Sequence, residues 1–214
     1  MNVSTIKHPA NPHVVISAYG GHFATRHSHN SHYIDITRLK HEYTMAREGA
    51  VILSQRYAYE KGVDTIVCLD GSEVIGAFLA RHLAQNDRFA VNRSKNINVI
   101  TPEYDSIGQL IFRDNLIPMV EGRDILVLIS TVNSGKTAGR CLECVQYYGG
   151  RVQGIAAVFS ALEAVGEVPV YALFTPQDIP GYCTSSPKTC PMCQAGKKLD
   201  GLVNSYGVSQ LQGG

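Results

Sequence analysis

The part of this 214-residue chain best suited to chemistry is the turn N-S-G-K-T. It stands between an apolar run fit for a buried strand, Ile125–Ile129, and a stretch of helical spacing that begins near Lys136. Consecutive N–H groups at a helix start favour an anion, because the peptide dipoles place partial positive charge there. The alternative is a polar helix cap with no ligand. We predict a phosphate-binding loop made of Asn133, Ser134, Gly135, Lys136 and Thr137.

The same turn permits another interpretation, the Walker A loop of nucleotide hydrolases, G-x-x-x-x-G-K-[ST]. Gly135, Lys136 and Thr137 fit that pattern, but its first glycine position holds Ser130, whose side chain crowds a turn around phosphate. The later apolar runs VQGIAAVFS and VPVYALFT end without an acidic residue that would hold magnesium. A P-loop-type nucleotide-binding protein is therefore a second alternative.

Cysteines near the C-terminus form a candidate metal site. Cys183, Cys190 and Cys193 lie close together, and the spacing of the last two suits one tetrahedral Zn²⁺ with a fourth ligand from elsewhere. Cys141 and Cys144 would complete a four-thiolate site, but helical spacing places Cys141 on the face that packs against the sheet. The alternative is a tail with free thiols or one disulfide.

Four histidines near the N-terminus form a second cluster, His22, His27, His29 and His32. Of these, His27 and His29 would share one side of an extended segment. Such a pair could bind a metal, and the alternative is an ordinary polar turn.

Apolar runs alternate with stretches of helical spacing from residue 41 onward. The predicted strands are 63–69, 96–100, 125–129, 152–159 and 168–174. The predicted helices are 41–61, one around 75–82 and one from about 136 to 148. This alternation predicts an α/β fold with a mostly parallel five-stranded sheet flanked by helices. The tail from Thr175 is rich in Pro, Gly and Cys, and we expect it to be irregular.

Four segments, in order, resemble the type I phosphoribosyltransferases, and most closely the orotate phosphoribosyltransferases. GHFATRHSHNSHYID (21–35) is similar to the N-terminal motif, and VDTIVCLDGSEVIGAFLA (63–80) to the strand, pyrophosphate loop and helix. GRDILVLISTVNSGKTAGRCLECVQYYGGRVQGIAAV (122–158) is similar to the strand, phosphoribosyl-diphosphate loop and helix. DIPGYCTSSPKTCPMCQAGKKL (178–199) resembles the C-terminal ending CPLCxxGxPL.

The resemblance implies a pyrophosphate loop at Asp70, Gly71 and Ser72, a ligand such as phosphoribosyl diphosphate or a nucleotide, and a homodimer. Mg²⁺ would be the cofactor of an active enzyme. The two acidic residues that bind ribose in working members fall at Ile129 and Ser130, and neither supplies an anion.

The family's mobile basic loop should lie at residues 101–122, but this segment contains no Lys or His. The basic residues in or beside it are Arg113 and Arg123, whereas its acidic residues are Glu103, Asp105, Asp114 and Glu121. Negative charge there has the wrong sign to stabilise leaving pyrophosphate. The small glycine of the family's N-terminal turn also falls at about His27 here. Catalytic residues therefore stay unknown, and transferase activity is expected to be weak or absent.

Composition sets the remaining expectations. Hydrophobic residues make up 44% of the chain and the net charge is +1, which predicts a packed core and no nucleic-acid or membrane partner. The layout of the N-terminus suggests a cytoplasmic protein. We expect one domain over 1–214, with a core at 41–174 and a small hood from 1–40 and 175–214. Its function would be to bind a 5′-phosphoribosyl compound or nucleotide, and the first alternative is an active transferase joining a nucleobase such as orotate to phosphoribosyl diphosphate.

Overall fold

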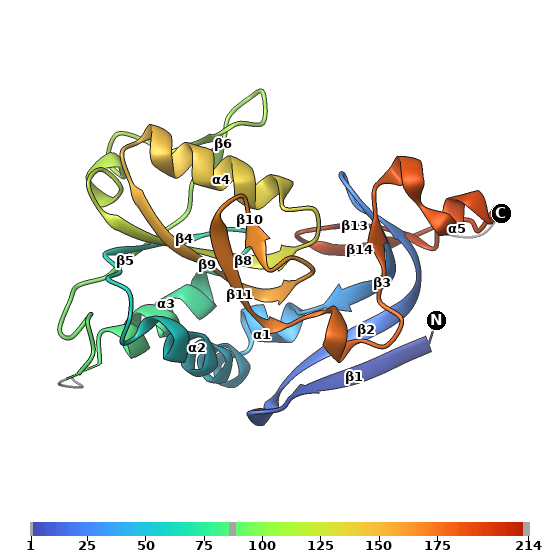
Figure 1. Cartoon of the computed structure of the whole chain (residues 1–214), viewed down its shortest axis with the longest axis horizontal. Coiled ribbons are helices and arrows are strands. Elements are labelled where there is room, and N and C mark those ends of the chain that lie inside the picture. Colours follow the sequence, from blue (N-terminus) through green and yellow to red (C-terminus); the bar gives the residue numbers. More distant parts are fainter. Residues whose placement is uncertain (1, 86–88, 212–214) are drawn as a thin grey trace.

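A computed structural model describes residues 2–85 and 89–211 of the chain. It contains two large sheets that lie side by side (Figure 1). One is flanked by helices and forms the core, and the other is made from the two ends of the chain and forms the hood. The names core and hood are used below for these two sheets with the helices beside them, and the division of the chain into a core at 41–174 and a hood at 1–40 and 175–214 stays a prediction.

The core sheet has the strand order β10-β11-β9-β8-β4-β5. Its parallel strands are β4 (Thr65–Cys68), β5 (Asn98–Ile100), β8 (Asp124–Val132), β9 (Arg151–Ser160) and β11 (Val168–Phe174). These are the five predicted strands, and a short antiparallel strand, β10 (Ala164–Val165), extends the sheet at the β11 edge. Because β4 and β8 are parallel neighbours, the loops after their carboxyl ends meet at one edge of the sheet.

Helices cover both faces of the core sheet (Figure 1). On one face lie α1 (Thr37–His41), α2 (Tyr43–Tyr57) and α3 (Glu73–Leu83), and on the other lies α4 (Lys136–Tyr147). Successive strand residues alternate between the two apolar layers: Ile66 packs with the α2 and α3 residues, whereas Val67 packs with the α4 residues. The predicted helix 41–61 is shorter than expected, since it begins at Tyr43 and ends at Tyr57.

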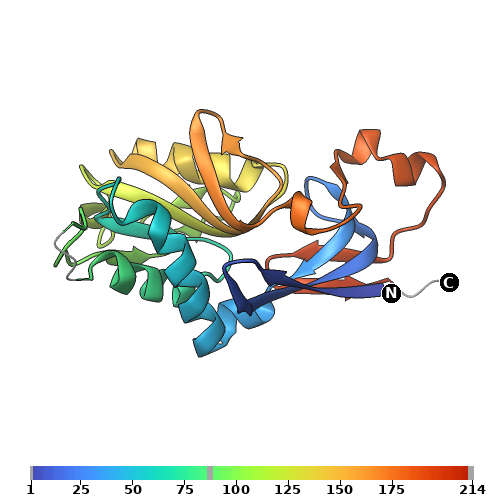
Figure 2. The same ribbon diagram turned by 60° about the horizontal axis from the view of Figure 1, so that its bottom comes forward.

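The hood is a sheet in which both ends of the chain take part (Figure 2). Its strands are β1 (Asn2–His8), β2 (Asn11–Ala24), β3 (His29–Asp35), β12 (Thr184–Ser185), β13 (Gly201–Asn204) and β14 (Gly207–Gln210). The order is β12-β3-β2-β13-β14, and β1 pairs with β2. β13 runs parallel to β2, with Gly201 opposite Phe23, so the last strands are fixed to the first.

The expectation of an irregular tail is wrong. Beyond Thr175 the chain forms short 3-10 helices, η2 (Pro176–Asp178) and η3 (Pro187–Thr189), a short helix α5 (Pro191–Gln194) and three hood strands. β13 and β14 form a local hairpin, but β12 pairs with β3 and β13 pairs with β2, partners far away in sequence that local composition does not reveal.

The segment after β5 forms a small hairpin of β6 (Glu103–Tyr104) and β7 (Leu110–Ile111), followed by the 3-10 helix η1 (Ile117–Met119). Among the described residues, no helix is both long enough and apolar enough to span a membrane.

Candidate functional site

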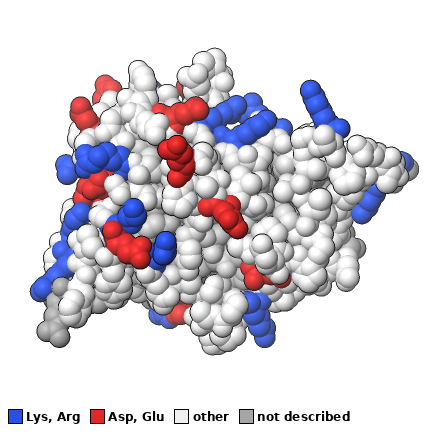
Figure 3. Space-filling view, in the orientation of Figure 1, with Lys and Arg blue, Asp and Glu red and all other residues white. Residues whose placement is uncertain are grey.

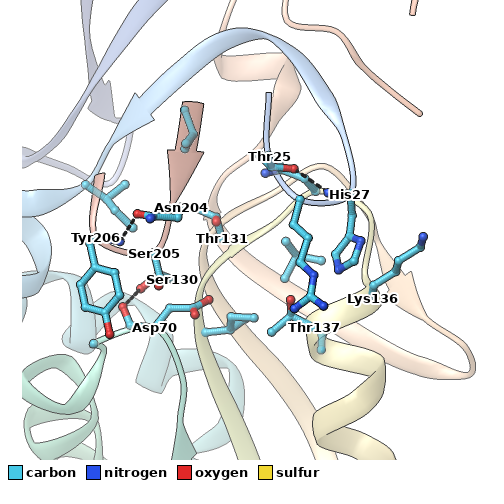
Figure 4. Close-up of a pocket in the computed structure, with 18 of the residues that line it drawn as sticks. Thr25, His27, Asp70, Ser130, Thr131, Lys136, Thr137, Asn204, Ser205 and Tyr206 are labelled. Carbon is cyan, nitrogen blue, oxygen red and sulfur yellow. Dashed lines mark hydrogen bonds between the residues drawn. The ribbon is translucent and has the colours of Figure 1, made fainter. Parts of the chain in front are cut away.

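A cavity of about 760 Å³ lies where the core meets the hood. The core lines it with the loops after β4 and β8 and with the start of α4. The hood lines it with the β2–β3 turn and the β13–β14 turn. In Figure 4, His27, Lys136 and Thr137 lie toward one side of the cavity, and Asp70, Ser130, Ser205 and Tyr206 lie toward the other. The two sides therefore differ in chemistry.

The predicted phosphate loop lines the first side. Gly135 is the N-cap of α4 and has a φ of 73°, a left-handed conformation that residues with a Cβ rarely adopt. No side chain caps this helix, so the alternative of a polar helix cap formed by a hydroxyl side chain is not what the structure has. Within the described part of the chain, no hydrogen bond occupies the backbone N–H groups of residues 134–137. These N–H groups are available to an anion at a helix start.

Asn133 differs from the other loop residues, because its side chain already has a partner. The Tyr182 hydroxyl donates a hydrogen bond to Asn133 Oδ1 at 2.8 Å, which joins the loop to the C-terminal tail. The side chain of Asn133 thus holds the loop in place, and the backbone of the following residues faces the cavity.

Positive charge gathers around the phosphate loop. Lys136 and Arg140 come from α4, and Arg26 and His27 come from the β2–β3 turn of the hood. Figure 3 shows Lys and Arg side chains gathered near the N-terminal end of α4. Within the described residues, neither the lysine nor the two arginines form an ion pair with an acidic side chain. Unpaired cations that share one cavity attract an anionic ligand.

The charge on His27 responds to these neighbours. Partial burial lowers the pKa of its ring below the ordinary value, and repulsion by Lys136 and the two arginines lowers the pKa further. Sequence reasoning considered His27 as a metal ligand and did not consider Arg26. The sequence feature that could have pointed to Arg26 and His27 is the polar turn at residues 25–28, between two strands. Only the folded chain shows that this turn shares a cavity with the start of α4.

The predicted pyrophosphate loop lies on the other side. Asp70 and Gly71 both adopt left-handed conformations, with φ of 57° and 75°, and both line the cavity. Burial raises the pKa of the Asp70 carboxyl, the positive charge of Lys40 opposes this, and Glu73 adds to the increase. Ser72 is different, because it is fully buried and its hydroxyl donates to the carbonyl of Leu128 at 3.1 Å. Ser72 therefore joins β8 to the loop and does not face the cavity.

Lys40 connects the loop that contains Asp70 with the hood through hydrogen bonds. Its side chain is buried, and Nζ donates to the carbonyl oxygens of Asp70 and Ser205, each at 2.9 Å. One ammonium group thus connects the loop after β4 with the β13–β14 turn. Sequence reasoning missed this residue, since nothing local distinguishes Lys40 from an exposed lysine on a helix.

The two positions of the expected acidic pair are occupied by buried, uncharged side chains. Ile129 is 1% exposed and packs in the apolar layer under α4. Ser130 is 3% exposed, and its hydroxyl donates to the Asp70 carbonyl at 2.9 Å. Mg²⁺ requires oxygen ligands in octahedral geometry. Ile129 offers no oxygen and the Ser130 hydroxyl is already engaged, so these two residues do not fit a magnesium site.

The segment at 101–122 borders the cavity without supplying a cation. Thr101, Pro102, Tyr104 and Leu110 contribute to the lining. Arg113 forms an ion pair with Glu103 at 2.8 Å, so its charge is compensated locally. The segment leaves the phosphate loop open to the cavity.

Four of the six cysteines form two pairs. Cys141 and Cys144 are buried in the apolar layer between α4 and the sheet, and Cys144 Sγ donates to the Leu110 carbonyl at 3.2 Å. Cys190 and Cys193 lie beside two histidines of the hood, His22 and His29.

Cys183, the third predicted zinc ligand, is not part of that group of ligand atoms within the described residues. The predicted pair of His27 and His29 is separated as well, because His29 faces the cysteines and His27 faces the cavity. His22 was not predicted as a ligand, and its place beside Cys190 follows only from the hood pairing.

Comparisons with known proteins bear on the fold. No protein-family model matches the chain, and no curated protein matches it either. Among solved structures, the chain is similar to the orotate phosphoribosyltransferase of Mycobacterium tuberculosis H37Rv in complex with Fe(III) dicitrate. The TM-score is 0.52 at 17% identity, and the match covers 76% of this chain and 91% of that one.

Two further structures are similar to a comparable degree. The same Mycobacterium tuberculosis enzyme in complex with 5-phospho-alpha-D-ribosyl 1-diphosphate has a TM-score of 0.50 at 16% identity, covering 68% of this chain and 82% of that one. The adenine phosphoribosyltransferase of Leishmania donovani has a TM-score of 0.50 at 13% identity, covering 71% and 73%. The predicted α/β fold of the type I phosphoribosyltransferases is confirmed.

Proposed function

We propose that this chain binds a 5′-phosphoribosyl compound or a nucleotide in the cavity between core and hood, with weak or absent transferase activity. The observation that carries the proposal is the phosphate loop itself. Its N–H groups at residues 134–137 have no partner among the described residues, and Lys136, Arg140 and Arg26 share its cavity. A phosphate group would accept hydrogen bonds from the loop and compensate this charge.

The rest of the ligand would lie toward the second side of the cavity. Tyr33, Ile34 and Ile36 of the hood and the β13–β14 turn provide mixed polar and apolar surface there. A ribose and an attached ring fit this combination, since both have polar edges and apolar faces. The solved neighbour with bound 5-phospho-alpha-D-ribosyl 1-diphosphate supports a ligand of this class.

Weak or absent transfer follows from the two positions beside the ribose. The reaction requires anionic groups at the ribose and a cationic group at the departing pyrophosphate, and such electrostatic contributions usually dominate the barrier. Ile129 and Ser130 cannot provide the first. The segment at 101–122 cannot provide the second, because its Arg113 is paired with Glu103. A ligand-sensing role suits a site that binds the ligand but does not catalyse the transfer reaction.

The first alternative is an active transferase that uses Mg²⁺ and a nucleobase such as orotate. It would require other carboxylates to take over, and Asp70 and Glu73 are those that line the cavity. The second alternative, a P-loop-type nucleotide hydrolase, is less favoured because Ser130 occupies its first glycine position and donates to Asp70. A homodimer in the cytoplasm is part of the proposal, by analogy with the resembled family.

Calorimetry with matched variants tests the binding proposal. Ribose 5-phosphate, orotidine monophosphate and unphosphorylated ribose would be titrated into the full chain and into Lys136→Gln. We expect binding of both phosphorylated compounds, no binding of ribose, and about tenfold weaker binding by the variant. Lys188→Gln removes an exposed lysine of the tail and serves as the control. Equal affinity of the wild type for ribose and ribose 5-phosphate would contradict a phosphate site.

A further inference from the structure

Four ligand atoms from three separate segments meet at one place in the hood. They are His22 Nε2 from β2, His29 Nδ1 from β3, and the sulfur atoms of Cys190 and Cys193 at the ends of the first turn of α5. All four lie within 4.8 Å of one another. None of them belongs to the cavity described above.

Four of the six separations are close to the edges of a zinc tetrahedron, and the other two lie within 4.8 Å. With Zn–N of about 2.05 Å and Zn–S of about 2.3 Å, tetrahedral angles require about 3.3 Å between two nitrogens and about 3.6 Å between nitrogen and sulfur. The two ring nitrogens lie 3.2 Å apart. The nitrogen–sulfur distances are 3.3 Å for His29 with Cys193, 3.5 Å for His22 with Cys190 and 3.7 Å for His22 with Cys193.

The tautomer of His22 suits a metal ligand. Its Nδ1 lies 2.9 Å from the carbonyl oxygen of Lys197, and a carbonyl can only accept, so the ring proton resides on Nδ1. In the neutral ring, Nε2 then carries a lone pair that faces His29, Cys190 and Cys193 together. A cation among the four atoms would satisfy this lone pair. A metal-bound histidine commonly donates its other N–H to a carbonyl in this way.

The segment that carries the two cysteines has little else to hold it. Within residues 186–198, all of which are described, Cys190 is the one buried residue. A segment without an apolar core gains its order from cross-links or metals. Cys190 is fully buried although the residues around it are exposed, and it packs toward His22, which is also fully buried.

We propose that His22, His29, Cys190 and Cys193 bind one structural zinc ion. Two nitrogens and two thiolates in a tetrahedral arrangement select Zn²⁺ among common divalent metals. All four ligands come from the chain, so no position stays open for a substrate, and the site is structural rather than catalytic.

The zinc site lies next to segments that line the cavity. His22 and His29 stand on either side of the β2–β3 turn, which carries Arg26 and His27 over the phosphate loop. Further along the chain from the cysteines, the Asp200 carboxylate accepts a hydrogen bond from the His22 backbone N–H at 2.6 Å, and β13 begins at the next residue. Zinc would therefore fix both hood turns in place.

Metal analysis of the purified full chain tests the proposal. The chain would be expressed with zinc in the medium and analysed under reducing conditions, together with Cys193→Ser and the control Cys183→Ser, in which an exposed thiol outside the group is removed. We expect about one zinc per chain in the wild type and the control, and zinc affinity lower by at least about tenfold in Cys193→Ser.

A second measurement on the wild type avoids dependence on variants that fail to fold. Replacement of zinc by Co²⁺ should give the intense visible absorption of a four-coordinate site with thiolate ligands. A wild type without stoichiometric zinc, a pale six-coordinate cobalt spectrum, a Cys190–Cys193 disulfide in freshly isolated protein, or unchanged zinc in Cys193→Ser would each overturn the proposal. Ribose 5-phosphate does not contact these ligands, so its binding to the wild type is tested separately.

Discussion

The hydroxyl of Ser130 donates a hydrogen bond to the backbone carbonyl of Asp70 at 2.9 Å. This contact joins the ends of β8 and β4, the two strands whose loops face the cavity. In the resembled enzymes the Ser130 position would hold a carboxylate that binds ribose. Here it holds a buried neutral group that joins the two loops, so the change affects both chemistry and packing.

We predict that restoring the acidic pair does not restore transferase activity. Ile129→Asp places a carboxylate in an apolar layer and should destabilise the protein by about 3 kcal/mol or more. Urea unfolding measures the loss, and Ile129→Val, with an expected loss of about 1 kcal/mol, is the control. Turnover by the folded Ile129→Asp, Ser130→Asp double variant would show that the acidic pair was the only lesion.

Lys40 should contribute to the free energy of unfolding, because its side chain is buried and donates two hydrogen bonds. In Lys40→Met, two partly buried carbonyls lose their charged donor, although that of Asp70 keeps the Ser130 hydroxyl, and we expect a loss of about 2 kcal/mol in the free energy of unfolding. Lys61→Met removes an exposed lysine and should change stability by less than about 0.5 kcal/mol. Equal stability of the two variants would mean that Lys40 does not connect core and hood.

Two glycine-to-alanine variants distinguish an effect on the geometry of the phosphate loop from the backbone strain that both substitutions cause. Gly135 and Gly196 have φ of 73° and 72°, so alanine at either position should cost about 1 kcal/mol. Only at Gly135 would the new Cβ meet a neighbour, Leu162 Cδ1 at 3.0 Å, and disturb the phosphate loop. We therefore expect Gly135→Ala alone to weaken binding of ribose 5-phosphate. The prediction fails if both variants bind as the wild type does.

Ligand binding should become tighter as the pH falls, partly because of His27. The pKa of this ring lies below its ordinary value of 6.5, first because of partial burial and then because of nearby cations, so the ring is neutral near pH 7. A bound phosphate favours the protonated ring, and His27 should therefore contribute to tighter binding as the pH falls toward the lowered pKa of the free ring.

The control for that pH dependence is His27→Asn, because the phosphate itself titrates in the same range. The wild type should show a steeper increase in affinity than the variant. Without ligand the sign is opposite: the unfolded chain binds more protons than the folded one, so His27 reduces stability as the pH falls through 6.5. Parallel affinity curves for the two proteins would exclude His27 from the site.

The core sheet and the turn proposed to bind phosphate could be located from the sequence because their signals are local. The run from Asp124 to Val132 is apolar, and the residues after Gly135 repeat with helical spacing, so strand, turn and helix follow from neighbouring residues. In β2 the burial alternates, with Val14, Ile16 and Ala18 buried, and this period of two could have revealed the hood strand.

The composition of the proposed metal site and the charge around the cavity could not be predicted in the same way. His22 and Cys190 are separated by 168 positions, and the pairings of β12 with β3 and of β13 with β2 bring their segments together. For the same reason Cys183, close to Cys190 in sequence, was expected as a ligand in place of a histidine. The cations of the β2–β3 turn reach the phosphate loop through the packing of hood against core, which no local spacing describes.

One measurement tests binding without transfer most directly. Phosphoribosyl diphosphate, orotate and Mg²⁺ would be added to the wild-type protein at near-equal concentrations and followed by ³¹P nuclear magnetic resonance. We predict that the 5′-phosphate signal shifts on binding in the wild type and not in Gly135→Ala, while no pyrophosphate is released above the protein-free control. Pyrophosphate release at a steady rate, or the absence of any shift of the 5′-phosphate signal, would contradict the account.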